Sequence, residues 1–255
     1  MAGIFLLSCN SSEEKKAESK VKYSSLVSQN LKGDISSVEE TPYKTDSTGK
    51  IGEMDSCCVS VTEYDENGND TKSVSKDSKG NPSSESVITH HPNGFFKSVT
   101  NTAKGKSTGG FETKIDDNGN IIWAGEIDSN GKGSVYYTNI AISEDGEVTG
   151  WKQFDKDSVF RQTGEAKYDK HLFMSGTIKD SVGKVKNSST AKYNDKGEQT
   201  EYSNTDITKD STKTTVTKYT YETHDDMGNW TQRTTWNDKG KATGIAKRTY
   251  TYRKK

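Results

Sequence analysis

The sequence predicts an all-β fold, an antiparallel meander of about 12–14 strands in hairpin repeats of about 26 residues. Three observations lead to this prediction. Only 28% of the 255 residues are hydrophobic and the mean hydropathy is −0.98, so a thick core is not expected. The chain has three prolines and is rich in Thr, Ser, Tyr and Gly, which is typical of strands joined by tight turns. Glycines within Asp/Asn-rich clusters recur along the chain, most of them about 11–15 residues apart. We therefore expect a meander that twists or curls into a partly closed sheet, because its aromatic side must be covered.

The chain opens with a short apolar segment followed abruptly by a polar one. Residues Leu6–Cys9, with the sequence LLSC, resemble the lipobox of bacterial lipoproteins, in which the cysteine carries the lipid anchor. The resemblance implies that residues 1–9 are part of a signal, that Cys9 is lipidated, and that the protein is anchored in the bacterial outer membrane and exposed at the surface. The alternative is an ordinary apolar N-terminus with a free thiol. Residues 10–30 are then expected to form a charged, flexible tether, and residues 31–255 a β-repeat domain.

The next segment, Tyr23–Gly33 (YSSLVSQNLKG), predicts a short helix that ends at Gly33. The segments after it alternate in polarity with the two-residue period of a strand. In VTKYTYE, Tyr219 and Tyr221 are expected on one face. In WTQRTTW the same alternation aligns Trp230 and Trp236, with Gln232 and Thr234 between them on that face. A transmembrane barrel is the competing fold, but charged residues interrupt nearly every strand and leave no continuous lipid-facing band.

The most regular local motif is Asp-x-x-Gly-Asn, as in YDENGN at Tyr64–Asn69. Asp65 is expected to accept backbone N–H bonds at the first turn position, and Gly68 to take the left-handed conformation that closes a type I turn with a bulge. A calcium loop is the alternative, but an EF-hand has its glycine at the sixth position and this motif has it fourth. We therefore predict turns that build hairpins, with no metal site and no cofactor.

Several segments resemble YD repeats of the RHS type, in the form found in Bacteroidetes envelope lipoproteins. The similarity is carried by YDENGN, by YNDKGE at Tyr193–Glu198 and by the long segment Tyr219–Tyr252. His91–Val99 (HPNGFFKSV) is similar to units of MORN-like repeat proteins. The resemblance implies a β-strand scaffold without shared catalytic residues.

The charge and the motifs of the chain exclude several classes of function. The net charge is −1 with Lys and Arg spread throughout, so no nucleic-acid partner is expected. The adjacent Cys57 and Cys58 have three possible states: a vicinal disulfide, disulfides between chains, or two unpaired thiols. We favour the unpaired thiols. His90–His91 should point to opposite faces of a strand, which disfavours a metal site. The chain contains no GxSxG, Walker A or HExxH motif.

The aromatic residues are the candidate ligand-binding groups, either as a stacking platform for sugars or as an anchor surface for a protein. The sequence therefore predicts a non-catalytic envelope lipoprotein that binds polysaccharide or an envelope protein, with a membrane partner through its lipid anchor. An envelope glycan hydrolase using turn carboxylates is one alternative, and an immunity or assembly protein for a toxin partner is another. The candidate aromatics are Trp123, Trp151, Trp230, Trp236, Tyr219 and Tyr221.

Overall fold

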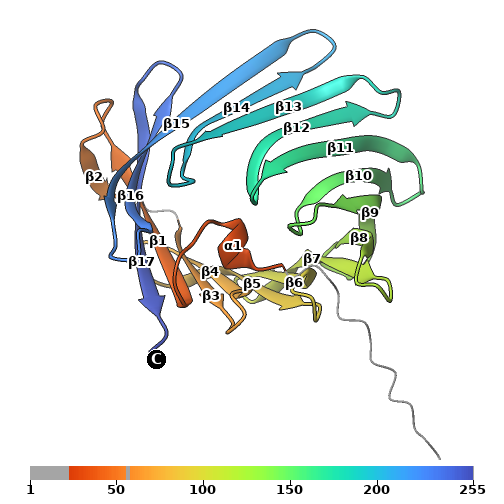
Figure 1. Cartoon of the computed structure of the whole chain (residues 1–255), viewed down its shortest axis with the longest axis horizontal. Coiled ribbons are helices and arrows are strands. Elements are labelled where there is room, and N and C mark those ends of the chain that lie inside the picture. The colour runs from red at the N-terminus through yellow and green to blue at the C-terminus, as the bar shows by residue number, and fades with distance from the viewer. Residues whose placement is uncertain (1–22, 56–57, 255) are drawn as a thin grey trace, which may run out of the picture.

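The computed structural model describes residues 23–55 and 58–254, and it is an all-β antiparallel meander in which 17 strands form one sheet (Figure 1). The predicted fold class is confirmed. In chain order the elements are α1 (Ser25–Ser28), β1 (Ile35–Thr45), β2 (Ile51–Met54), β3 (Val59–Tyr64), β4 (Asp70–Lys76), β5 (Pro82–His90), β6 (Phe96–Ala103), β7 (Lys106–Ile115), β8 (Ile121–Ile127), β9 (Gly133–Ile142), β10 (Val148–Asp155), β11 (Phe160–Asp169), β12 (Leu172–Asp180), β13 (Val185–Tyr193), β14 (Gln199–Ile207), β15 (Thr212–His224), β16 (Trp230–Asn237) and β17 (Ala242–Tyr252).

The sheet closes on itself, so the predicted curling goes as far as a barrel. β1 pairs with β17, β9 with β10, and β1 with β3, which joins 16 strands into a ring. β2 pairs with β1 as a hairpin beside that ring. The strand number exceeds the predicted 12–14. Four connections have no glycine to mark them: the one between β2 and β3, the turns β10–β11 and β11–β12, and the turn Thr208–Ser211.

The hairpin turns have the predicted geometry. In the turn between β3 and β4, Gly68 donates its N–H to the Asp65 carbonyl at 3.0 Å and has a φ of 80°. The Asp65 Oδ1 accepts the backbone N–H groups of Asn67 and Asn69, each at 2.9 Å. The same pattern recurs at Asp116 and at Asp225. Successive turns of a meander lie at alternate ends of the barrel. One end, called here the capped end, holds the turns β3–β4, β5–β6, β7–β8, β9–β10, β11–β12, β13–β14 and β15–β16.

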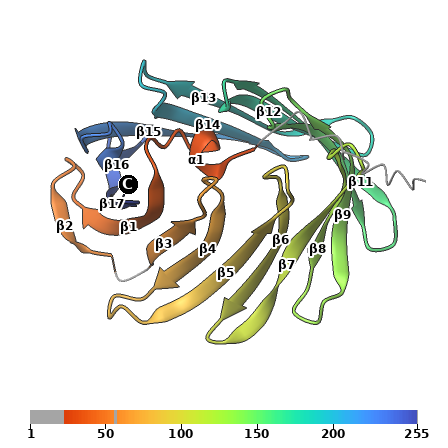
Figure 2. The ribbon, with the colours of Figure 1, turned by 60° about the horizontal axis from the view of Figure 1, so that its bottom comes forward.

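The chain before β1, Tyr23–Gly33, is called here the N-terminal segment, and it lies inside the ring of strands (Figures 1 and 2). Its helix α1 is only four residues long and ends at Ser28, with Gln29 as its C-cap, instead of reaching the predicted Gly33. The reason is Asn30, whose φ of 54° ends the helical path three residues early. Gly33, with a φ of 90°, makes a separate bend into β1.

Two turns of the capped end hold the start of the N-terminal segment. The Tyr23 N–H donates to the carbonyl of Asn93 in the β5–β6 turn at 3.1 Å. The Leu26 N–H donates to the carbonyl of Gly68 in the β3–β4 turn at 3.0 Å. A side chain at Gly94 would place its Cβ 2.2 Å from the Tyr23 carbonyl oxygen, so this glycine permits the close approach.

Two turns on another part of the ring hold the end of the same segment. The Asn30 amide donates to the carbonyl of Gly197 at 3.0 Å. The Asn229 side chain accepts the Lys32 N–H and donates to the Lys32 carbonyl, both at 2.8 Å. Tyr23–Asn30, which the sequence assigns to the end of the tether, thus form a brace between separate hairpins of the barrel.

The main buried cluster lies where this brace meets the closing seam. Ile35 at the start of β1 is fully buried, beside Leu26 of α1 and Tyr64 at the end of β3. Most other inward residues are only half-buried, which agrees with the thin core expected from composition. The rest of the cluster is Val38, with Leu31, Tyr250 and Tyr252 packed against it.

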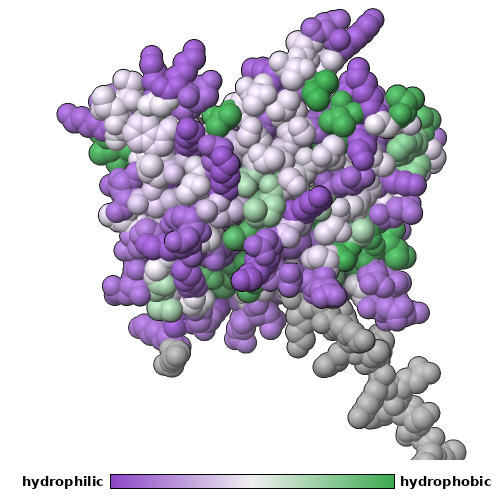
Figure 3. All heavy atoms as spheres, turned by 45° about the horizontal axis from the view of Figure 1, so that its top comes forward, coloured by the Kyte–Doolittle hydropathy of each residue, from purple (hydrophilic) through white to green (hydrophobic). Residues whose placement is uncertain are grey.

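The outer face is largely hydrophilic on the side drawn in Figure 3, where hydrophobic residues form separate small patches. Tyr193 lines an internal cavity, and successive side chains of a strand point to opposite faces of the sheet. The neighbouring Lys192 therefore points outward. Lys192 forms an ion pair with Glu201 across β13 and β14 at 2.8 Å, and Lys72 pairs with Glu85 across β4 and β5 at 2.7 Å. Outward ion pairs suit water better than lipid.

Two sequence predictions concern cysteines. Cys58 is disulfide-bonded, so the preference for an unpaired thiol was wrong at this position, while Cys57 lies outside the described residues. The predicted lipidation site, Cys9, also lies outside them. Within the part of the chain that the structure describes, no helix has the length and apolar character needed to cross a membrane.

Candidate functional site

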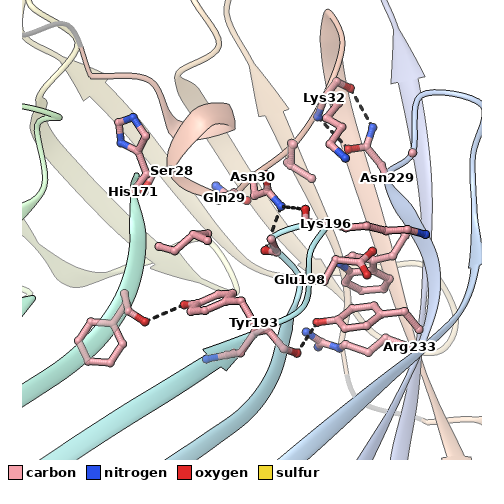
Figure 4. Close-up of a pocket in the computed structure, with 18 of the residues that line it drawn as sticks. Ser28, Gln29, Asn30, Lys32, His171, Tyr193, Lys196, Glu198, Asn229 and Arg233 are labelled. Carbon is pink, nitrogen blue, oxygen red and sulfur yellow. Dashed lines mark hydrogen bonds between the residues drawn. The ribbon is translucent and has the colours of Figure 1, made fainter. Parts of the chain in front are cut away.

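A cavity of about 370 Å³ lies inside the barrel at the capped end, and is called here the lumen cavity (Figure 4). Gln29 and Asn30 of the N-terminal segment form one side, and Tyr193, Glu198 and Arg233 form part of the wall opposite. The N-terminal segment fills only part of the interior, and barrels of this strand number are wider than their own side chains can fill. The other main contributors to the lining are Ser28, Lys32, Glu147, Tyr168, His171, Phe173, Lys196, Gln199, Tyr221, Asn229, Trp230 and Arg248.

Two histidine–carboxylate pairs have their glutamates in this lining. The Glu147 carboxylate lies 3.1 Å from His171 Nδ1, and the Glu198 carboxylate lies 2.5 Å from His224 Nε2. Both glutamates are buried, with relative exposures of 7% and 8%. Each pair links one hairpin of the capped end to the next, so the partners are far apart in sequence. The sequence analysis missed both pairs, although a histidine follows each glutamate by one hairpin repeat, at 24 and 26 residues.

A third pair fixes α1 to the wall. His90 Nε2 lies 3.3 Å from the Asp70 carboxylate, which also accepts the Ser25 hydroxyl at 2.6 Å. Burial raises the pKa of Asp70, but the bonds from His90 and Ser25 outweigh it and leave the pKa below its ordinary value. The neighbouring His91 instead meets Thr113 Oγ1 at 3.0 Å, so the two histidines have different partners.

The structure brings together only half of the six candidate aromatics. Trp230 and Tyr221 line the lumen cavity, and Tyr219 joins them through Arg233, whose guanidinium lies 5.0 Å from its ring centroid. Trp123 stands apart beneath the Lys114 ammonium group, 4.8 Å away. The other two lie on further parts of the sheet, Trp151 edge-on to Tyr137 and Trp236 bonded to Thr220.

The predicted alternation along β16 was wrong because the β15–β16 ladder contains irregularities. Its register shifts on both sides of Thr223, so that Tyr221 pairs with Arg233 and His224 with Trp230. The residue that joins Trp230 on the inner face is therefore Arg233, where Gln232 and Thr234 were expected. A further shift after Thr235 pairs Trp236 with Ala242 of β17. A regular two-residue period cannot reveal such bulges.

Trp230 serves as a platform for arginines. The Arg248 guanidinium lies 4.0 Å from its ring and that of Arg233 lies 4.8 Å away. The ring is 9% exposed, so little of it is free for a ligand. Tyr193 and Tyr221 offer more accessible rings, and their hydroxyls are already bonded to backbone carbonyls, at 2.9 and 2.8 Å.

Two turn aspartates, Asp77 and Asp116, lack the raised pKa that a general acid needs. Hydrogen bonds from the side chain and backbone of Asn120 lower the pKa of Asp116. The backbone N–H of Asn81 does the same for Asp77. A general acid at neutral pH needs a raised pKa. The described residues hold no group of three His, Cys, Asp or Glu side chains that would suit a metal ion.

Comparison with known proteins identifies the fold. No family model and no curated protein matches the chain. A porin-like protein from Bacteroides uniformis superposes with a TM-score of 0.55 at 15% identity, over 85% of this chain and 96% of that one. The likeness extends to the fold alone. Weaker similarities are to a porin-like protein from Bacteroides vulgatus (TM-score 0.37, 13% identity, 86% and 99% covered) and to the Tc holotoxin pore of Photorhabdus luminescens (TM-score 0.32, 15% identity, 81% and 11% covered). Membership in the YD-repeat family stays a prediction.

Proposed function

We propose that this chain is a bacterial envelope lipoprotein whose barrel binds a short saccharide in the lumen cavity. The cavity is the observation that carries the proposal. It combines accessible tyrosine rings, such as Tyr193 and Tyr221, with polar groups such as the carboxylate of Glu198 and the amide of Gln199. Sites for small molecules combine apolar walls with a few well-placed polar groups in volumes of about 300–1,000 Å³. Aromatic rings can cover the faces of a sugar while polar groups bond its hydroxyls.

The envelope location has separate support. The fold shared with a porin-like protein of Bacteroides uniformis is compatible with an envelope protein. The lipobox-like Leu6–Cys9 supports a lipid anchor at Cys9. Replacing Cys9 by alanine should move the protein from the membrane fraction to the soluble fraction after cell lysis. Unchanged partitioning would contradict the anchor.

Calorimetric titration with a panel of mono- and disaccharides tests the binding proposal. Leu172 lines the cavity, so L172W should fill part of it and weaken binding by about 10-fold or more. The matched control is I122W, because Ile122 is 53% exposed and outside the cavity. Binding by L172W equal to that of I122W, or no binding of any sugar by the wild type, would refute the proposal.

A glycan hydrolase is the second candidate, favoured by one observation. Glu147 and Glu198 come from different turns and line the same cavity, and glycosidases need two carboxylates facing one cleft. Release of reducing ends from oligosaccharides by the wild type, lost in E147Q or E198Q, would establish this function. Sugar that is bound and recovered intact would leave the binding function alone.

A further inference from the structure

The charges around the lumen cavity indicate which class of sugar it takes, an inference that rests on the proposed function. Four cationic side chains line the cavity, against two carboxylates. This local excess of positive charge contrasts with the chain as a whole, whose net charge is −1. The cations are Lys32, Lys196, Arg233 and Arg248, and the carboxylates are Glu147 and Glu198.

The carboxylates and one of the arginines already have partners. Glu147 is bonded to His171, and Glu198 to His224. Glu198 also accepts the Asn194 amide at 2.7 Å. Arg248 forms an ion pair with Glu40 of β1 at 2.7 Å between Nε and Oε2. Of the four cations, only Arg248 therefore has an ion pair with a residue that the structure describes, which leaves Lys32, Lys196 and Arg233.

Arg233 is left without a counter-ion. Its guanidinium lies between the rings of Trp230 and Tyr219, at 4.8 and 5.0 Å from their centroids. No ion pair in the described part of the chain includes Arg233, Lys32 or Lys196. The Arg233 Nε is buried and has no hydrogen-bond acceptor. Arg233 lines the cavity, and buried polar groups in proteins are almost always bonded, so its bare N–H indicates that an acceptor is missing.

We propose that the lumen cavity binds a carboxylated sugar, a uronic acid, with its carboxylate on the cavity side of the Arg233 guanidinium. A planar guanidinium matches a carboxylate in a two-bond arrangement, and stacking on Trp230 holds it in place. Tyr193 and Tyr221 stand in the same lining for the sugar ring. Lys196, in the β13–β14 turn, adds positive charge at the capped end.

Paired titrations test this inference: digalacturonate against neutral galactobiose, and a glucuronate-containing disaccharide against its neutral glucose counterpart. The wild type should bind the acidic member of at least one pair about 10-fold to 100-fold more tightly. R233Q should lose this preference and keep the weaker binding of the neutral member. K192Q removes an outward cation, and should bind like the wild type.

Arg233 packs between two rings, so the thermal unfolding of R233Q must be measured alongside its binding. K196Q is the second variant, because Lys196 is exposed and its side chain has no ion pair among the described residues. It should reduce acidic-sugar binding about 2- to 5-fold without lowering the melting temperature. Equal binding of acidic and neutral sugars would overturn the inference and leave the proposed function intact. An acidic preference that survives in folded R233Q would overturn the role of Arg233, and no sugar binding at all would overturn both proposals.

Discussion

The contribution of the docked N-terminal segment to stability can be measured with two glycines of nearly equal φ. Gly94 and Gly80 have φ values of 83° and 81°, so alanine at either position carries the left-handed strain of roughly 1–2 kcal/mol. A Cβ at Gly80 meets nothing within 4 Å, whereas at Gly94 it lies 2.2 Å from the Tyr23 carbonyl oxygen. G94A must therefore displace Tyr23, and G80A need displace nothing.

The displacement has a cost that the structure allows us to estimate. Tyr23 would lose its 3.1 Å hydrogen bond to Asn93, worth about 1 kcal/mol. It would also lose its stacking on Phe95, with ring centroids 6.0 Å apart, worth about 0.5–1.5 kcal/mol. In urea unfolding, G94A should be less stable than G80A by about 2 kcal/mol, and limited proteolysis should cut it faster near Tyr23. Equal stability of the two variants with equal cleavage would refute the docking.

Two further predictions concern the same capped end. N229A should lower the free energy of unfolding by about 2–3 kcal/mol, because it removes the two hydrogen bonds to Lys32 and one of 2.8 Å to Tyr252. N120A, at the matching but exposed position of another turn, should lower it by less than about 1 kcal/mol. Equal losses of the two variants in urea unfolding would contradict this prediction. Burial, followed by the charge of Asp70, raises the pKa of the folded-state Tyr64 hydroxyl from 10 to about 12. The neutral Tyr64 side chain therefore stabilises the fold fully below pH 10, and this stabilisation is lost as the pH rises from 10 to 12. Y64F should show a shallower loss of stability over this pH range than the wild type, and an unchanged slope would show that Tyr64 ionises freely in the folded protein.

The strands and turns could be predicted because their determinants are local. Asp65 and Gly68 serve a turn only four residues long, and the same residues recur in later turns. The closure of the barrel could not be predicted in this way. It depends on contacts such as Arg248 with Glu40, 208 positions apart, and no periodicity along the chain records them.

The candidate site was only partly predictable for a related reason. Trp230 and Tyr221 were expected to be functional aromatics, and they do line the cavity. Arg233 was assigned to the wrong face because bulges shift the β15–β16 ladder. The Glu147–His171 pair joins two hairpins, and its significance emerges only when the ends of those hairpins are known to be adjacent.

The seam between the first and last strands of the ring has a consequence for how the protein folds. The paired residues of β1 and β17 lie more than 200 positions apart in the chain, and pairing at such separation is slow. Until then both strands are open edges that another copy of the chain could extend, the usual start of aggregation. Glu40 and Arg248 are cross-strand neighbours in the finished seam. Before closure each is a charge on an unpaired strand edge, which disfavours pairing with another chain. The ion pair that stabilises the closed barrel therefore also protects the open, partly folded chain from aggregation.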